Sequence, residues 1–414
     1  MPMPSSHFQS VGQMYRDFKV TKVLPIPELQ CQMIELEHLP TGALIMHIAN
    51  EDPENVFCLS FRTIPSSSNG VAHILEHTVL CGSKKFPVKD PFFAMTRRSL
   101  NTFMNAFTGS DFTCYPAASQ VPKDFYNLLN VYLDAVFHPN LKELSFLQEG
   151  HRLEFVTPDD PTSPLEYKGI VFNEMKGAMS SPSTRLAEIM NEALFPNLTY
   201  GFNSGGDPKV IPQLTYDELC AFHQKSYHPI QCLFFFYGNM PLEGHLDFIV
   251  ENALKGVAKA PHLPQIPRQP RYATPCYVEQ RYPISADEPL KDKTLISFGW
   301  LTCHILEQED LLALSILEVI LLDTDASPLK MALLKSGLCT QVGSHLDGEI
   351  SEVPFIITVR GSNPENANEL EKLIRQTLLD IVEKGIPPEL IENAIHQLEL
   401  HRSEITGDRN GHFG

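Results

Sequence analysis

The sequence predicts an α+β protein of two domains, each a mostly antiparallel sheet with helices packed on it. Two observations carry this prediction. Short apolar runs bounded by turn residues alternate with longer runs of helical spacing in both halves of the 414-residue chain. A proline-rich segment with little aliphatic character, residues 259–275, separates the halves. We therefore expect a first domain at residues 1–258, a linker at 259–275 and a second domain at 276–414.

Turn chemistry and apolar spacing predict the elements of the first half. Residues 42–63 predict two strands joined by a polar turn, and residues 102–118 predict a hairpin around Thr108–Asp111. The run CLFFFYG at 232–238 has the length of a buried strand. Helices are expected from near Asn69 and at residues 90–100, 122–138, 145–155, 168–179, 183–195 and 215–228.

The second half restarts the same order of strand and helix. A strand is expected at residues 294–301, a helix at 309–322 and a strand pair at 339–361. Two long amphipathic helices follow, one after Asn363 and one after Pro387.

The two halves also share a short segment, which suggests that they are structural repeats. Ile-Leu-Glu occurs at residues 74–76 and again at 316–318. Aligning the two places Ser315 and Val319 where the first copy has histidines. The apolar residues recur without the imidazoles, so the packing of this helix does not require histidine. A chance match of so short a segment is the alternative.

Composition narrows the partners and the compartment. Lys plus Arg number 32 against 50 Asp plus Glu, a net charge of −18, which opposes nucleic acid and anionic membranes as partners. The nine cysteines form no C-x-x-C pair, which favours a reducing compartment. No targeting segment and no membrane-spanning apolar run is recognised. We expect a cytoplasmic protein, or a mitochondrial matrix protein if a presequence has been removed.

The stretch HILEH, residues 73–77, carries the chemistry. On a helix, His73 and His77 lie one turn apart on one face, and Glu76 lies on the same side. Two such imidazoles can hold one metal ion, and the adjacent carboxylate can act on a bound water. The order H-x-x-E-H is the inverzincin signature. A lone histidine on a half-apolar helix is more often a hydrogen-bonded core residue, and only the full pattern outweighs that interpretation.

A catalytic zinc site needs a third protein ligand besides the two histidines. Glu174 stands out because it lies in an apolar helix, where an unpaired carboxylate is costly. Helical spacing alone does not choose it over Glu149 or Glu154. Cys81, one turn after His77, could instead complete a closed structural site.

HILEH, followed by NAFTGSDFTCYP, QEGHRLEF, GIVFNEMKG, GGDP and YHP, resembles the pitrilysin/insulinase family of zinc peptidases, and within it the presequence protease subfamily. The resemblance extends from about Phe18 through the rest of the chain. It implies one zinc ion held by His73, His77 and Glu174, with Glu76 as general base. It also implies two domains of duplicated fold, the second without the metal motif.

Two departures from the family pattern matter. Many relatives carry a glutamate that supports the site one or two helical turns before the third ligand, but Tyr167 stands seven residues before Glu174. Glu149 is the substitute candidate, with an ordinary surface carboxylate as the alternative. Full-length members also possess another half, which closes over the first and supplies an Arg/Tyr pair to the substrate. This chain therefore resembles an N-terminal half, truncated within its second domain, whose partner is that C-terminal half.

The expected function is a zinc-dependent endopeptidase that hydrolyses unstructured peptides with a zinc-bound water. By resemblance, Asn105, Ala106 and Phe107 form an open sheet edge to which a peptide adds as a strand. An ordinary turn role for Asn105 is the alternative. At the level of function, the alternatives are a non-catalytic peptide-binding or assembly subunit, and a fragment that binds zinc without cleaving alone.

Overall fold

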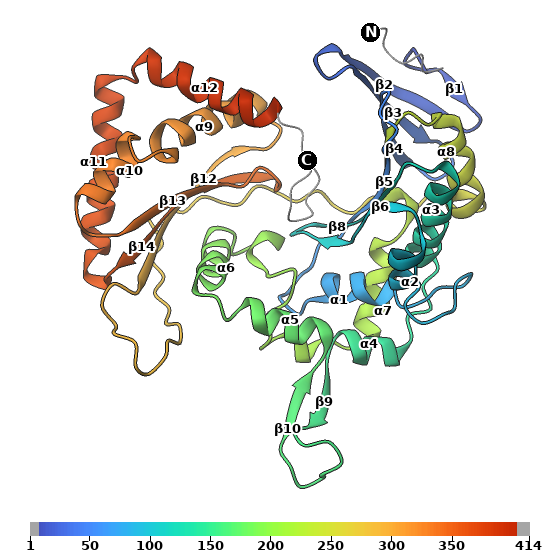
Figure 1. Cartoon of the computed structure of the whole chain (residues 1–414), viewed down its shortest axis with the longest axis horizontal. Helices are drawn as coiled ribbons and strands as arrows, with labels where there is room; N and C mark the ends of the chain where they lie inside the picture. Colours follow the sequence, from blue (N-terminus) through green and yellow to red (C-terminus); the bar gives the residue numbers. More distant parts are fainter. Residues whose placement is uncertain (1–7, 404–414) are drawn as a thin grey trace. The chain divides into compact units, whose positions relative to one another are not determined.

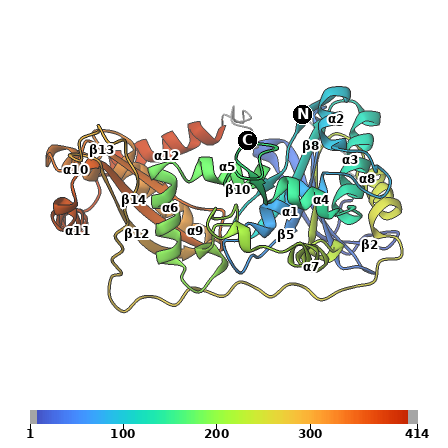
Figure 2. The same cartoon turned by 90° about the horizontal axis from the view of Figure 1, so that it is seen from below.

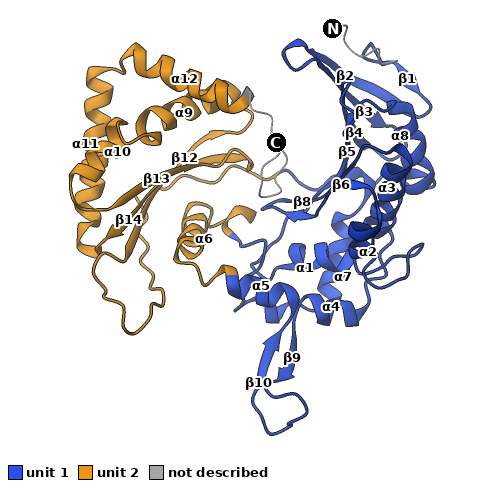
Figure 3. Cartoon of the chain, in the orientation of Figure 1, with its two compact units in different colours: residues 1–177, 202–265 blue, residues 178–201, 266–414 orange. Residues whose placement is uncertain are grey.

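The structure of the chain is a computed structural model that describes residues 8–403 (Figure 1). The expectations about a targeting segment and a truncated C-terminus fall on residues outside this range. Two compact units are present (Figure 3). The first contains the described residues up to Gly177 together with Phe202–Gln265, and the second contains Ala178–Gly201 and the described residues from Ile266 onward. Each unit has a sheet with packed helices, so the predicted α+β class is confirmed.

The first unit contains a nine-stranded sheet in the order β1-β2-β3-β4-β11-β5-β8-β6, with β7 also paired to β8. All pairs are antiparallel except β4 with β11. Its strands are β1 (Met14–Tyr15), β2 (Phe18–Ile26), β3 (Cys31–His38), β4 (Ala43–Ala49), β5 (Asn55–Arg62), β6 (Asn101–Met104), β7 (Phe107–Thr108), β8 (Phe112–Ser119) and β11 (Cys232–Gly238).

Strand β11 is the CLFFFYG run, and it lies between β4 and β5. Side chains at every second position of β11 are buried, among them Phe234 and Phe236. The burial follows from its place within the sheet, one face of which is covered by helices.

Helices of the first unit cover the sheet and carry the site. They are α1 (Val71–Val79), α2 (Pro91–Arg98), α3 (Pro122–Phe137), α4 (Glu143–Glu149), α5 (Ile170–Ala178), α7 (Tyr216–Ser226) and α8 (Leu242–Ile249). Helices α3 and α8 lie side by side (Figures 1 and 2), in contact through the rings of Tyr126 and Phe248. Helix α7 begins with a capping box formed by Thr215 and Glu218.

The helix predicted at residues 145–155 is wrong in its second half. Helix α4 ends at Glu149, and the next residues form strand β9 (Arg152–Phe155), which pairs with β10 (Leu165–Lys168). The break comes at Gly150, a residue of low helix propensity. The resulting β9–β10 hairpin projects from the unit (Figure 1) and leads directly into α5.

The second unit has a three-stranded antiparallel sheet in the order β12-β14-β13. The strands are β12 (Thr294–His304), β13 (Gln341–Leu346) and β14 (Glu352–Ser362), and the helices are α6 (Pro182–Leu194), α9 (Gln308–Glu318), α10 (Pro328–Lys335), α11 (Ala367–Lys384) and α12 (Pro388–Ser403). Helix α6 packs on β12, so residues 178–201 belong to this unit and not to the first domain, where the sequence analysis placed them.

The proline-rich segment contains no helix or strand but is held by hydrogen bonds within each unit. In the first unit, Arg62 donates to the carbonyl oxygens of Leu263 (3.1 Å) and Pro264 (3.0 Å). In the second unit, the buried Glu352 accepts from Arg271 at 2.7 Å and from the backbone N–H of Gln269. The division between the units at residues 265 and 266 therefore falls between two anchored stretches, not in a long free linker.

The first unit contains a buried pair of histidines. His47 on β4 and His245 on α8 are almost inaccessible, and their ring centroids lie 5.9 Å apart. Burial lowers the pKa of His47 to about 4, although the Gly238 carbonyl and Glu243 oppose the shift. Burial and the neighbouring His47 lower the pKa of His245 as well.

We expect the free energy of unfolding to fall as the pH drops below the ordinary histidine pKa. At such a pH His47 of the unfolded chain binds a proton, whereas His47 of the folded protein stays neutral. Part of the free energy of unfolding that is present at neutral pH is therefore lost on acidification. His47 alone should account for about 2 kcal/mol between about pH 7.5 and about pH 5. Urea unfolding at both values checks this, with His47→Leu expected to reduce the difference. An equal pH dependence in both proteins would contradict the assignment.

Candidate metal and catalytic site

Helix α1 presents the HILEH segment and is held in place at its N-terminus by glycine contacts. Gly70 precedes the helix with a φ of 71°, a conformation that favours glycine. A Cβ there would lie 3.0 Å from the carbonyl oxygen of Gly205 and 3.2 Å from the Cα of Gly206. The backbone N–H of Asp207 donates to the carbonyl of Ser68 at 2.8 Å, which ties the same loop to α1. The GGDP segment thus lies directly beside His73.

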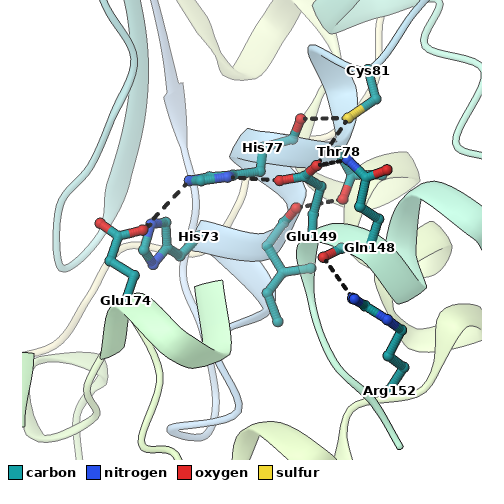
Figure 4. A network of polar contacts seen from close by, with 9 residues as sticks. His73, His77, Thr78, Cys81, Gln148, Glu149, Arg152 and Glu174 are labelled. Carbon is teal, nitrogen blue, oxygen red and sulfur yellow. Dashed lines mark hydrogen bonds and ion pairs between the residues drawn. The ribbon is translucent and has the colours of Figure 1, made fainter. Parts of the chain in front are cut away.

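Hydrogen bonds at Nδ1 set the orientation of both imidazoles, and Figure 4 shows the one between His77 and Glu149. His73 Nδ1 lies 3.1 Å from the carbonyl oxygen of Gly205, and His77 Nδ1 lies 3.1 Å from Glu149 Oε2. Both partners can only accept, so each Nδ1 carries the proton. In the neutral rings the lone pair therefore sits on Nε2, which is the arrangement of a metal-binding histidine.

Glu174 on α5 faces both free imidazole nitrogens. Its Oε2 lies 3.6 Å from His73 Nε2 and 3.9 Å from His77 Nε2. One ligand atom from each of the three residues lies within 4.8 Å of the others, and no other such group of three is present within residues 8–403. The Glu174 side chain is 54% exposed, so the cluster opens to solvent.

Glu149 lies on the opposite side of the His77 ring from Glu174 (Figure 4). Its side chain is 7% exposed and also accepts from Gln148 at 2.8 Å. Burial would lower the pKa of His77, but the hydrogen bond that His77 donates to Glu149 and the charges of three nearby carboxylates raise it overall. Although burial opposes it, the bond to His77 lowers the pKa of Glu149. A buried carboxylate that orients an imidazole is not an ordinary surface residue.

The other candidate ligands lie elsewhere. The Cys81 thiol is directed toward the His77 carbonyl (3.4 Å) and Glu149 Oε1 (3.8 Å). Burial, followed by the charge of Glu149, raises its pKa to about 12, so it is a thiol and not a thiolate ligand. Glu154 pairs with Arg152 at 2.6 Å on the β9–β10 hairpin. Tyr167 lies on the same hairpin, opposite Leu153.

Glu76 is buried at the base of the cluster. Thr108, at the end of β7, donates to its Oε2 at 2.6 Å. Burial raises the pKa of Glu76, while the Thr108 hydrogen bond and the two imidazoles oppose the rise. A carboxylate with a raised pKa is a stronger base than an ordinary surface glutamate.

Asn105 and Ala106 lie between β6 and β7, and Phe107 is the first residue of β7. The two strands occupy the outer edge of the nine-stranded sheet. The N–H of Asn105 donates to Pro116 on β8 at 3.1 Å, so the segment pairs inward with that strand. The N–H of Ala106 is bonded to the Asn105 side chain at 2.9 Å. Thr108 connects this edge directly to Glu76.

Sequence reasoning missed two contributors. The Gly205 carbonyl orients His73, but backbone atoms carry no sequence signature beyond the GGDP motif itself. The sequence indicates a turn role for Thr108, whereas in the structure the pairing of β7 with β8 brings its hydroxyl group to Glu76. Asp207 and His228 stabilise their loops, each by accepting from a backbone N–H two residues later.

Comparison with known proteins shows what the chain is similar to. Residues 62–155 match the family described as insulinase (peptidase family M16), and residues 213–398 match the peptidase M16 inactive domain. The mitochondrial presequence protease of Xenopus laevis is 44% identical over 409 residues, which cover 96% of this chain and 39% of that protein. Protein HypA of Clostridium perfringens is 39% identical, over 95% of this chain and 40% of its own length.

Solved structures share the fold at low sequence identity. A protease from Helicobacter pylori superposes with a TM-score of 0.65 at 18% identity, covering 88% of this chain and 83% of that one. Pitrilysin superposes with a TM-score of 0.63 at 17% identity, covering 92% of this chain and 39% of its own. The chain thus spans about two fifths of the length of the curated relatives described above. Within the described range, no helix has the length and apolar character needed to cross a membrane.

We expect Glu149→Gln to lower the pKa of His77 in the metal-free protein. The substitution removes the negative charge that favours the imidazolium but keeps an oxygen that can accept from Nδ1. Titration of the His77 ring signals by NMR measures the shift. Glu154→Gln, a change of the same kind on the neighbouring hairpin, should leave His77 unaffected. An unchanged His77 pKa in Glu149→Gln would contradict the charge coupling.

Proposed function

Because the chain belongs to the insulinase (M16) family of peptidases, we propose that it carries the catalytic centre of a zinc-dependent endopeptidase that acts on unstructured peptides. The observation that carries the proposal is the convergence of two Nε2 atoms and one carboxylate oxygen within 4.8 Å. The mitochondrial presequence protease of Xenopus laevis is more than twice as long as this chain, so the proposal concerns the catalytic centre and not the activity of a protein of that length.

His73, His77 and Glu174 would hold the zinc ion. Two neutral imidazoles and a carboxylate are the donor set of many hydrolytic zinc sites, and the proton positions at Nδ1 leave both Nε2 atoms available. The Glu174 side chain is 54% exposed, so water and a substrate carbonyl can reach the cluster from this side. When bound, zinc supplies Lewis acidity, which makes water more acidic and polarises a carbonyl group.

Glu76 acts as the general base. Its Oε2 is engaged by Thr108, and we assign proton uptake from the attacking water to Oε1. The same carboxyl group then delivers the proton to the leaving amine. Glu149 keeps the His77 ring oriented throughout by accepting its Nδ1–H.

An extended peptide is the substrate form that the sheet edge favours. Residues Asn105–Phe107 lie at the outer edge of the sheet and connect to Glu76 through Thr108, so a peptide added along this edge would pass the base. Folded proteins already pair their backbone groups, which selects for unstructured peptides. The presequence proteases among the relatives support this substrate class.

A non-catalytic subunit is the competing function. The match of residues 213–398 to an inactive domain concerns a region that begins after the last of the four site residues. The complete set of His73, Glu76, His77 and Glu174 favours catalysis, since a binding subunit has no use for a buried base beside a metal site. For the compartment, we propose the cytoplasm or the mitochondrial matrix, because the relatives include bacterial and mitochondrial proteins.

We expect Glu76→Gln to keep zinc and lose cleavage. Glutamine retains the shape and an acceptor for Thr108 but cannot take a proton, so kcat should fall by at least about 100-fold. Turnover of a fluorogenic peptide and zinc content are measured on the same preparation. Glu154→Gln serves as the control and should keep both properties. Retained turnover in Glu76→Gln would remove this residue from the role.

We expect Ala106→Pro to raise KM. Proline removes a backbone donor and disturbs the edge to which the peptide would add, costing about 10-fold in KM if one or two hydrogen bonds are lost. Ala106→Ser keeps the N–H and should behave like the wild type. Steady-state kinetics on a peptide series separate the effects on KM and kcat. An unchanged KM in Ala106→Pro would argue against strand addition.

A further inference from the structure

Two glycines meet at the base of the β9–β10 hairpin, one on each leg. Gly150 directly follows Glu149 at the end of α4, and Gly169 directly precedes α5. The hairpin between them begins with the pair Arg152 and Lys168. Glu149 and Glu174, the two carboxylates on opposite sides of the His77 ring, therefore come from the two ends of one hairpin.

The contact between the glycines leaves no room for a side chain. A Cβ built on Gly169 would overlap the carbonyl oxygen of Gly150, which is backbone and cannot move aside. Gly169 does not have a positive φ, so space and not conformational freedom requires glycine here. A Cβ on Gly150 would in turn lie 3.1 Å from Ile74 Cγ2, next to His73 on α1. The base of the hairpin thus rests against the helix that carries both histidines.

Helix α5 begins directly after this contact, at Ile170. The Gly169 carbonyl accepts the first hydrogen bond of the helix from Asn173 at 3.0 Å. Glu174 follows five residues after Gly169, with its Oε2 3.6 Å from His73 Nε2. A displacement of Gly169 would carry the whole first turn, and Glu174 with it, away from the imidazoles.

We propose that Gly169 is a positioning residue of the metal site, which sets the distance of Glu174 from the two imidazoles through its backbone contact with Gly150. The inference rests on the proposed function, since it assigns Glu174 as a ligand. Gly169 touches neither the metal position nor the substrate. It acts only by fixing where α5 begins.

Zinc affinity of the 414-residue chain, measured by competition with a chromophoric chelator, tests the proposal. We expect Gly169→Ala to weaken zinc binding by about 10-fold or more, the size of effect seen when groups that orient ligands are changed. The matched control is Gly177→Ala in the same helix. A Cβ there meets nothing within 4 Å, so its affinity should equal that of the wild type.

A double-mutant cycle shows whether the loss of zinc affinity in Gly169→Ala passes through Glu174. In a Glu174→Ala background, Gly169→Ala should cause no further loss, because its effect passes through Glu174. Wild-type affinity in Gly169→Ala, or an equal loss with and without Glu174, would overturn the proposal. A wild-type chain that binds no zinc would overturn the proposed function as well. If Gly169→Ala does not fold, Gly150→Ala disturbs the other leg of the hairpin base, where its Cβ would lie 2.9 Å from the Phe146 carbonyl oxygen and 3.1 Å from Ile74 Cγ2. A smaller loss of zinc affinity that depends on Glu174 is then expected.

Discussion

The direction of two imidazole rings is the constraint on which the site depends. Each ring gives its Nδ1 proton to an acceptor from another part of the chain, a backbone carbonyl at Gly205 and a buried carboxylate at Glu149. These bonds fix the tautomer and the rotation of both rings. The Gly70–Gly206 contact and the Gly150–Gly169 contact can be understood as the means of bringing those acceptors close to α1.

Charge around α1 gives a second reason for a cation. Three carboxylates, those of Glu76, Glu149 and Glu174, act on His77 and together raise its pKa against the effect of burial. The half-buried cluster therefore carries more negative than positive charge when both imidazoles are neutral. A divalent ion bound by the cluster would compensate this excess of negative charge.

Much of the site was predictable from the sequence, because its ligands lie on regular elements. His73, Glu76 and His77 share one helix, where spacing alone places them on one side. Glu174 could be chosen as the third ligand only through the resemblance to a family, because tertiary packing, and not sequence spacing, brings α5 close to α1. Backbone acceptors and the Thr108 hydroxyl could not be predicted, because their roles depend on how separate segments meet. The hairpin at 152–168 was missed because its first strand reads as a continuation of α4, and the assignment of α6 to the second unit depends on packing against β12.

The position of β11 has a consequence for how the protein is made. This strand is the only parallel neighbour of β4, and it lies between β4 and β5 although some 170 residues separate it from β5 in sequence. During synthesis the early strands emerge first, but their final order cannot be reached until residue 238 is available. The segments that carry α1, α4 and α5 are thus synthesised before the sheet that supports them can be completed. The side chains of the candidate site therefore depend for their support on a strand that follows all of them in the sequence.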